Sequence, residues 1–268
     1  MRIDRETRLC ISLSARPGQF GVRFHNFLYA ELGLNFIYKA FSTHDLPGAI
    51  TGIRALGIRG CGVSMPFKEA SIPLVDSIDA STRAIGALNT IVNDDGHLRA
   101  YNTDYLAVRQ LLEPIPRDTR FALRGSGGMA KAVAAALCNE GFRSGTIIAR
   151  NPATGRALAE AYGFGWAAEI DHRPALLINA TPVGMAGGAE AGELAFSPEA
   201  IEDARLVFDV VAVPLETPLL RAARARGKQV IGGGEVLLRQ GVEQFVLYTG
   251  VRPDDDLLRR AGEHALQP

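Results

Sequence analysis

The sequence predicts an α/β protein in which short apolar strands alternate with helices. After residue 118, apolar runs of about four residues are separated by segments with helical spacing, as expected for a parallel sheet covered on both faces. A glycine-rich turn follows the first of these strands and leads directly into an alanine-rich helix. These two observations predict a Rossmann-like, doubly wound domain in the second half of the chain.

The glycine-rich turn is a candidate dinucleotide site. Glycine lets the backbone turn sharply and approach a ligand, and the unpaired N–H groups at the start of a helix attract a diphosphate. The spacing departs from G-x-G-x-x-G, because Ala130 holds the third glycine position. A tight turn without a ligand is the alternative. The candidate residues are Gly125, Ser126, Gly127, Gly128, Met129 and Ala130.

The end of the next strand bears on the choice of nucleotide. Folds of this kind that take NAD usually place an acidic residue there, about 20 residues after the glycines, to bind the ribose 2′-hydroxyl. Here the strand ends in Ile148-Ala149-Arg150-Asn151, which contains no carboxylate. A guanidinium at Arg150 suits a 2′-phosphate and favours NADP, with a solvated arginine as the alternative. Arg124 and Arg156 are further sources of positive charge.

We expect the first half of the chain to form a second α/β region. Pro114 and Pro116 lie among charged residues and mark the predicted boundary, which gives domains at 1–113 and 114–234. In the first half we expect strands near 9–14, 35–41, 59–64 and 87–92, and helices near 24–32, 45–56 and 105–112. In the rest we expect strands near 121–124, 146–149, 175–180, 206–211 and 229–231, and helices near 130–139, 154–162, 197–201, 219–225, 235–247 and 254–266.

Several polar residues of the first half are candidates for a site. Ser12 and Ser14 alternate at a strand end, so both hydroxyls can line one wall, although the residues alone favour solvated serines in a loop. A surface lysine is the simpler interpretation of Lys68. Asn89 interrupts an apolar strand and needs a partner, either backbone or ligand. Asp104 precedes a helix and has a simple interpretation as its N-cap.

The composition excludes several classes of protein. Lys plus Arg equals Asp plus Glu at 29 each, which argues against binding to nucleic acid or to an anionic membrane. No apolar run approaches the ~20 residues of a membrane span. Cys10, Cys61 and Cys138 are too far apart for a disulfide framework or a metal site. With a charged N-terminal segment in place of a secretory signal, we expect a cytoplasmic protein without a metal.

Several short blocks, in order along nearly the whole chain, together resemble one family. In the first half they are Ser12-x-Ser14, His25-Asn26, Ser64-Met65-Pro66-Phe67-Lys68-Glu69, Ala87-Leu88-Asn89-Thr90 and Asn102-Thr103-Asp104. In the second half they are Gly125-Ser126-Gly127-Gly128, Asn179-Ala180-Thr181-Pro182-Val183-Gly184-Met185, Thr217-Pro218-Leu219-Leu220 and Gln240. This set resembles the shikimate dehydrogenase family, which acts in the chorismate pathway of aromatic amino acid biosynthesis.

The resemblance implies two α/β domains with a cleft between them. The N-terminal domain, completed by helices within 235–268, is expected to bind a shikimate-like cyclic hydroxy acid, and the second domain NADP. Lys68 and Asp104 are the implied catalytic pair. Ser12 and Ser14 are implied to hold the substrate carboxylate, and Ser64, Asn89 and Gln240 its ring hydroxyls. The resemblance also extends the nucleotide site to Asn179, Thr181, Val211 and Gly233.

Three departures favour the shikimate dehydrogenase-like branch of the family. A longer loop with Arg16 and Arg23 separates Ser14 from His25-Asn26. Ala212 stands where the family commonly has tyrosine, and Ala149 replaces the asparagine of N-R-T. Two other functions stay open: a quinate or shikimate dehydrogenase that uses NAD, and a sensor that binds nucleotide and metabolite without turnover. We expect a monomer or homodimer.

Overall fold

The computed structural model describes residues 3–170 and 172–267 of the chain. By residue contacts the chain divides into two compact units. The first unit comprises Met1–Thr103 and Gln240–Pro268, and the second comprises Asp104–Arg239. Two helices, α4 (Thr103–Leu112) and α9 (Gly233–Thr249), each contain one of the junctions. The junctions therefore lie ten residues before and five residues after the predicted bounds at 113 and 235.

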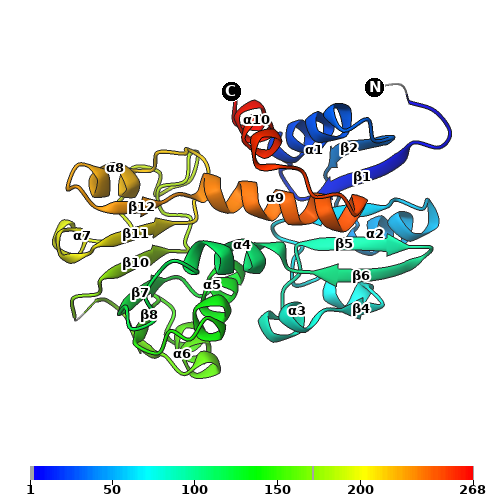
Figure 1. Ribbon diagram of the computed structural model, residues 1–268. Coiled ribbons are helices and arrows are strands. Elements are labelled where there is room, and N and C mark those ends of the chain that lie inside the picture. The colour runs from blue at the N-terminus through cyan, green and yellow to red at the C-terminus, as the bar shows by residue number, and fades with distance from the viewer. Residues whose placement is uncertain (1–2, 171, 268) are drawn as a thin grey trace. The chain divides into compact units, whose positions relative to one another are not determined.

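The first unit contains a mixed six-stranded sheet with the order β2-β1-β3-β5-β6-β4 (Figure 1). Strand β1 is parallel to β2 and β3, β5 is antiparallel to both β3 and β6, and β4 is parallel to β6. The strands are β1 (Arg8–Leu13), β2 (Phe36–Phe41), β3 (Gly60–Val63), β4 (Ser77–Ile78), β5 (Thr90–Asp94) and β6 (His97–Tyr101). The other helices are α1 (Phe20–Glu31), α2 (Leu46–Ala55), the 3₁₀ helix η1 (Ile72–Leu74), α3 (Ala80–Ile85) and α10 (Asp255–Leu266).

The two faces of this sheet are covered by different side chains. On one face, strand residues such as Ile11 and Leu13 pack with Ile50 and Ile53 of α2 in an aliphatic core. On the other face, β3 carries Gly60 and Gly62. A Cβ at Gly60 would overlap the ring of Tyr248, and one at Gly62 would lie 2.9 Å from the Tyr38 hydroxyl. Glycine on β3 therefore makes room for aromatic rings from β2 and α9.

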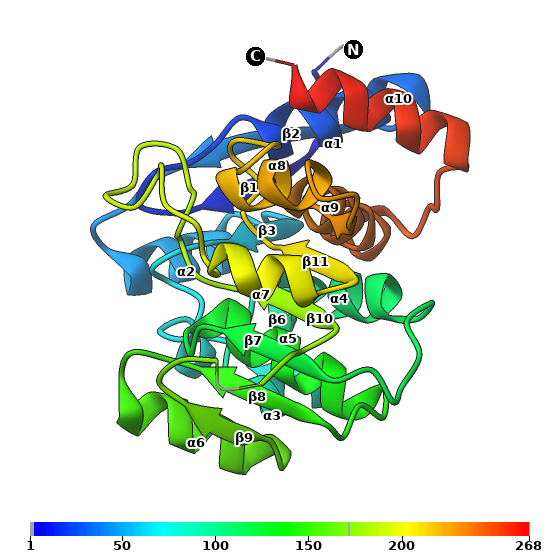
Figure 2. The ribbon, with the colours of Figure 1, turned by 90° about the vertical axis from the view of Figure 1, so that its left-hand side faces the viewer.

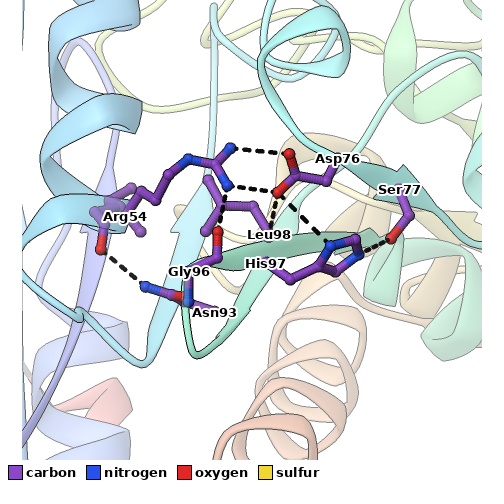
Figure 3. Close-up of polar contacts among 8 residues, drawn as sticks. Arg54, Asp76, Ser77, Asn93, Gly96, His97 and Leu98 are labelled. Atoms are coloured by element: carbon purple, nitrogen blue, oxygen red, sulfur yellow. Dashed lines mark hydrogen bonds and ion pairs between the residues drawn. The ribbon is translucent and has the colours of Figure 1, made fainter.

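A polar cluster ties α2 to the β5–β6 hairpin (Figure 3). The Asp76 carboxylate accepts hydrogen bonds from the Arg54 guanidinium at 2.6 Å and from the Leu98 backbone N–H at 2.7 Å. Arg54 also donates to the carbonyl of Gly96 in the hairpin turn. These bonds lower the pKa of Asp76, with the hydrogen bond from Arg54 as the largest cause. The imidazole of His97 lies beside Asp76 and contacts Ser77.

The second unit contains a six-stranded sheet in which all strands are parallel, with the order β12-β11-β10-β7-β8-β9 (Figure 2). Counted from its own first strand, this is the order 3-2-1-4-5-6 of a doubly wound dinucleotide fold. The strands are β7 (Phe121–Arg124), β8 (Gly145–Ile148), β9 (Gly165–Ala167), β10 (Leu176–Asn179), β11 (Leu206–Asp209) and β12 (Gln229–Ile231). The crossover helices are α5 (Gly128–Asn139), α6 (Pro152–Tyr162), α7 (Pro198–Asp203) and α8 (Pro218–Arg224). Helix α5 packs on α6, and α7 packs on α8.

The structure confirms the predicted fold class, an α/β protein with a Rossmann-like, doubly wound second part. The sequence pattern did not predict five short elements: η1, β4, α3, β6 and β9. Each is six residues or fewer, so hydrophobic periodicity has too few positions to show. Helix α1 begins at Phe20, four residues before the predicted start at residue 24. In the described part of the chain, no helix combines the length and the apolar composition needed to cross a bilayer.

Candidate active site

Four candidate residues of the first unit lie on loops that backbone hydrogen bonds join to one another. Beyond the carboxyl ends of β1 and β3, the Ser64 N–H donates to Leu13 O at 3.0 Å and the Ala15 N–H to Met65 O at 3.2 Å. The Leu88 N–H donates to Lys68 O at 3.1 Å. The segments that carry Ser14, Ser64, Lys68 and Asn89 therefore belong to one local assembly.

Neither of the two alternating serines is exposed, so the interpretation of solvated serines is wrong, although Ser14 does lie in the loop that follows β1. Ser12 is half-buried in β1 and pairs in register with Gly62 of β3, on the face toward Tyr38. Ser14 is 5% exposed, and its hydroxyl has no hydrogen-bond partner among the described residues. A buried hydroxyl without a partner is costly, and such a group is often completed by a ligand or a bound water.

Asn89 lies at the centre of a buried hydrogen-bond network. Its Oδ1 accepts the backbone N–H of Thr103 at 2.7 Å and the hydroxyl of Thr90 at 2.9 Å, and its Nδ2 donates to Thr103 Oγ1 at 3.0 Å. The amide that interrupts the apolar strand therefore has backbone and side-chain partners. One consequence is that Asn89 satisfies the first N–H of α4, the helix that carries Asp104.

The other catalytic and substrate-binding candidates differ in exposure. Lys68 is half-buried, whereas Ser64 is exposed. Asp104 is 8% exposed and lies within the first turn of α4, which already begins at Thr103. The interpretation of Asp104 as the N-cap is therefore wrong, because Asn89 supplies the acceptor for that end of the helix.

Helix α9 contributes two glutamines one turn apart. Gln240 is half-buried, and its Oε1 accepts from the Thr103 hydroxyl at 3.5 Å. Gln244 is 6% exposed; its Nε2 donates to Thr90 Oγ1 at 3.0 Å and to Asn89 O at 3.3 Å. Gln244 was not among the predicted site residues. The signal that could have found it is a second amide four residues after Gln240, on the same face of the helix.

In the second unit, the glycine turn lies at the point where the strand order reverses. Strand β7 is paired with both β8 and β10, so the loops after β7 and β10 leave the sheet in diverging crossovers. Gly125 has φ +125°, and a Cβ there would lie 2.9 Å from Ala180 O. Glycine is thus required at this position by conformation and by the approach of the loop after β10.

The rest of the turn has space for a ligand. A Cβ at Gly127 or Gly128 would meet nothing within 4 Å, and Gly127 is the exposed N-cap of α5. Met129 is half-buried and Ala130 is buried in the first turn of that helix. An open glycine surface at a helix N-terminus, at the reversal of strand order, fits the diphosphate of a dinucleotide.

Arg150 follows β8 and is exposed, as the NADP prediction requires. Its guanidinium pairs with the Glu190 carboxylate at 3.2 Å. Asn151 caps α6 by accepting from the N–H groups of Ala153 and Thr154, and the Ser126 hydroxyl lies 2.8 Å from that of Thr154. The two further arginines, Arg124 and Arg156, lie over the rings of Phe196 and Trp166.

The carboxyl ends of β10 and β11 are joined by a buried polar cluster. Asn179 Nδ2 donates to Asp209 Oδ1 at 2.9 Å, and the Thr217 hydroxyl donates to Asp209 Oδ2 at 2.7 Å. Burial raises the pKa of Asp209, and these hydrogen bonds oppose the rise. Asn179 Oδ1 also accepts the backbone N–H and the hydroxyl of Thr181, which fixes the loop opposite Gly125.

Val211 and Gly233 meet at the start of α9. Val211 is buried, and its N–H donates to Asp209 Oδ1 at 3.1 Å. A Cβ at Gly233 would overlap the Val211 backbone, so the helix begins in direct contact with the end of β11. Among the described residues, no group of three or more His, Cys, Asp or Glu side chains is arranged to hold a metal ion.

Comparison with known proteins places this arrangement in a family. A family model described as the shikimate dehydrogenase substrate binding domain matches residues 20–91. A shikimate dehydrogenase-like protein of Haemophilus influenzae is 53% identical over 98% of this chain and 98% of that protein. The chain belongs to the shikimate dehydrogenase family.

Members of this family resemble the chain in sequence and in structure. A shikimate dehydrogenase (NADP(+)) of Moorella thermoacetica is 38% identical, over 94% of this chain and 92% of that protein. The crystal structure of shikimate 5-dehydrogenase from Thermus thermophilus, in complex with NADP(H) and shikimate, superposes with a TM-score of 0.87. It is 31% identical, and the match covers 97% of this chain and 100% of that one. The resemblance found in the sequence motifs is thereby confirmed.

Proposed function

We propose that this shikimate dehydrogenase family member is an NADP-dependent oxidoreductase that interconverts 3-dehydroshikimate and shikimate, or a closely related cyclic hydroxy acid. One observation supports this most directly. The loops that carry Ser14, Ser64, Lys68 and Asn89 are joined by backbone hydrogen bonds, and the buried Ser14 hydroxyl has no partner among the described residues. A carboxylate oxygen of the substrate would accept a hydrogen bond from that hydroxyl.

In this proposal the first unit binds the substrate. Ser12 and Ser14 hold the carboxylate, and Ser64, Asn89 and Gln240 bind the ring hydroxyls. The second unit binds NADP through the glycine turn, with Arg150 on the 2′-phosphate and the cluster around Asn179, Thr181, Val211 and Gly233 beside the nucleotide. When bound, NADPH supplies the hydride that reduces the ketone.

Lys68 and Asp104 move the proton that the reaction also requires. Reduction of a ketone leaves negative charge on its oxygen, and the Lys68 ammonium can hold that oxygen and donate a proton to it. The Asp104 carboxylate, next to the Thr103 amide that Asn89 fixes, can receive or return a proton in the opposite direction. Positioned proton transfer of this kind contributes roughly 10²–10⁴-fold in rate.

Two other functions are alternatives to this proposal. The carboxylate of Glu190 beside Arg150 could accept a ribose 2′-hydroxyl, which would favour NAD and a quinate or shikimate dehydrogenase. A sensor without turnover would need the binding residues but not Lys68 and Asp104. The departures at Ala149, Ala212 and the loop before His25 leave the physiological substrate to experiment.

An assay with four mixtures separates these functions. The protein is mixed with NADP or NAD and with shikimate or quinate, and absorbance of the reduced nicotinamide is followed. We expect reduction of NADP with shikimate. Turnover only with NAD and quinate would favour the second function. No turnover with either acid, together with thermal stabilisation by NADP, would contradict the proposed enzyme reaction and favour the sensor or another substrate.

A further inference from the structure

The two amide side chains of the proposed substrate site, Asn89 and Gln240, each have a donor end and an acceptor end. An amide presents either N–H groups or an oxygen to a ligand, depending on how it is turned. Which end is presented decides which groups a substrate must carry. The polar groups around both amides therefore determine specificity as much as the amides themselves.

A backbone group fixes the orientation of Asn89. The Thr103 N–H can only donate, and it lies 2.7 Å from Asn89 Oδ1. The Thr90 hydroxyl also donates to Oδ1, and it in turn accepts from Gln244 Nε2 at 3.0 Å. Because these donors hold Oδ1, the NH₂ group of Asn89 lies on the opposite side of the amide.

The Thr103 side chain receives that NH₂ group. Thr103 is fully buried, and its hydroxyl accepts from Asn89 Nδ2 at 3.0 Å. A hydroxyl that accepts in this way still has one proton to donate. Three oxygens lie within reach of that proton: Asn89 Oδ1 at 3.1 Å, Thr90 Oγ1 at 3.3 Å and Gln240 Oε1, on α9, at 3.5 Å. Because Asn89 Oδ1 already accepts from the Thr103 N–H and the Thr90 hydroxyl, the Thr103 hydroxyl can direct its proton to Gln240 Oε1 and so connect the two amides.

We infer that Thr103 is a positioning residue: its backbone N–H sets the orientation of the Asn89 amide, and its hydroxyl holds one N–H group of Asn89 and the oxygen of Gln240. Through these bonds it selects ring substituents that accept hydrogen bonds. This inference rests on the proposed function. The Thr103 hydroxyl accepts a hydrogen bond from one of the two N–H groups of Asn89. The second N–H group is the one that donates to the substrate ring. A hydroxyl or keto oxygen at that place is accepted, whereas a protonated amine, which only donates, is rejected.

The contribution of Thr103 to folding can be separated from its contribution to substrate selection. Its backbone N–H remains bonded to Asn89 Oδ1 whatever side chain follows. Thr103→Val has nearly the same shape and removes only the hydroxyl, while Thr103→Ser retains it. Thr82→Val is the matched control: Thr82 is a fully buried threonine of α3, outside the proposed site.

The first experiment measures kcat and KM for shikimate, and Kd for NADP, in these three variants. We expect Thr103→Val to raise KM about tenfold or more, which corresponds to ~1.4 kcal/mol. Thr103→Ser should stay within about twofold of wild type, and Thr82→Val should leave KM unchanged. With an analogue that lacks the ring hydroxyl, Thr103→Val should have no effect. Unchanged KM for shikimate, or an equal loss with the analogue and with NADP, would overturn the inference.

A second experiment does not depend on turnover. Side-chain amide protons of Asn89 are followed by NMR hydrogen exchange, with Asn89→Asp used for assignment. We expect one protected proton in the wild type and in Thr103→Ser, and faster exchange in Thr103→Val. Equal protection in Thr103→Val would refute the inference even if shikimate is not a substrate. An inactive wild type with the expected NMR result would instead refute the proposed function alone.

Discussion

In the first unit the candidate site is made of side chains, whereas in the second it is made largely of backbone. Asn89, Thr90, Thr103 and Gln244 form a chain of buried amides and hydroxyls that comes from segments far apart in the sequence. The glycine turn of the second unit offers open backbone at the N-terminus of α5. A side-chain network distinguishes substrates by hydrogen-bond direction, and a backbone cradle accepts any ligand with the right phosphate geometry.

Loss of Lys68 is the largest effect that this comparison predicts. Lys68→Ala should reduce kcat by roughly 10²–10⁴-fold, because the proton donor is removed, while binding of NADP stays unchanged. The measurements are steady-state turnover and nucleotide titration. Lys39→Ala, at an exposed lysine of β2, is the control and should retain wild-type turnover. Undiminished turnover in Lys68→Ala would remove Lys68 from the mechanism.

We expect the buried ring of His25 to make the first unit sensitive to acid. His25 stacks on Tyr38 at 4.4 Å between centroids and is packed against Tyr29, Phe245 and Tyr248. Burial lowers the pKa of His25 to about 3, while a hydrogen bond with Gln244 opposes the shift. Because the unfolded chain binds a proton near pH 6.5 and the folded chain does not, stability falls as pH decreases below that value, by about 1.4 kcal/mol per pH unit.

Urea unfolding at pH values from about 7 down to about 4 tests this dependence. His25→Phe should have a flatter pH profile than the wild type below pH 6.5, whatever its stability at neutral pH. His44→Gln, at an exposed histidine, should retain the wild-type profile. If His25→Phe and the wild type have parallel profiles, the histidine is not the source of the acid sensitivity.

Two glycines of the same turn should respond differently to alanine. Gly125→Ala forces a side chain into φ +125° and against Ala180 O, and we expect it to lower the free energy of unfolding by about 1–3 kcal/mol. Gly127→Ala should leave stability within about 0.5 kcal/mol but weaken NADP binding, because its Cβ would enter the space for the diphosphate. Thermal unfolding and nucleotide titration measure both. Equal NADP affinity in Gly127→Ala and wild type would argue against a diphosphate there.

The smallest effect is expected at Asp76. Asp76→Asn removes the charge that pairs with Arg54, so we expect a decrease of a few degrees in Tm at neutral pH. The pKa of Asp76 is lowered in the folded state, so its contribution is present above the ordinary aspartate pKa and is lost as pH falls through the lowered pKa. The two Tm values should therefore converge once pH falls below the lowered pKa of Asp76. A difference that persists there would point to lost packing instead of lost charge.

The backbone-built site was the more predictable of the two. Strand, glycine turn and helix are adjacent in sequence, so the residues at 121–139 indicate the fold directly and predict a place for the diphosphate. The side-chain network was harder to foresee, because Thr103 and Gln244 bond to Asn89 only after the chain has folded. The pairing of Arg150 with Glu190 was also missed, since 40 residues separate the two in sequence.

The glycines of β3 are covered by a helix that lies near the end of the chain, so the first sheet can be completed only late in synthesis. Gly60 and Gly62 leave space that Tyr248 and Gln244 of α9 fill, yet these partners are synthesised long after the strand. The second unit, at Asp104–Arg239, is complete in the chain before them. During synthesis the strands of the first sheet therefore emerge before α9 can cover Gly60 and Gly62, and surface exposed in this way favours misfolding until α9 is present.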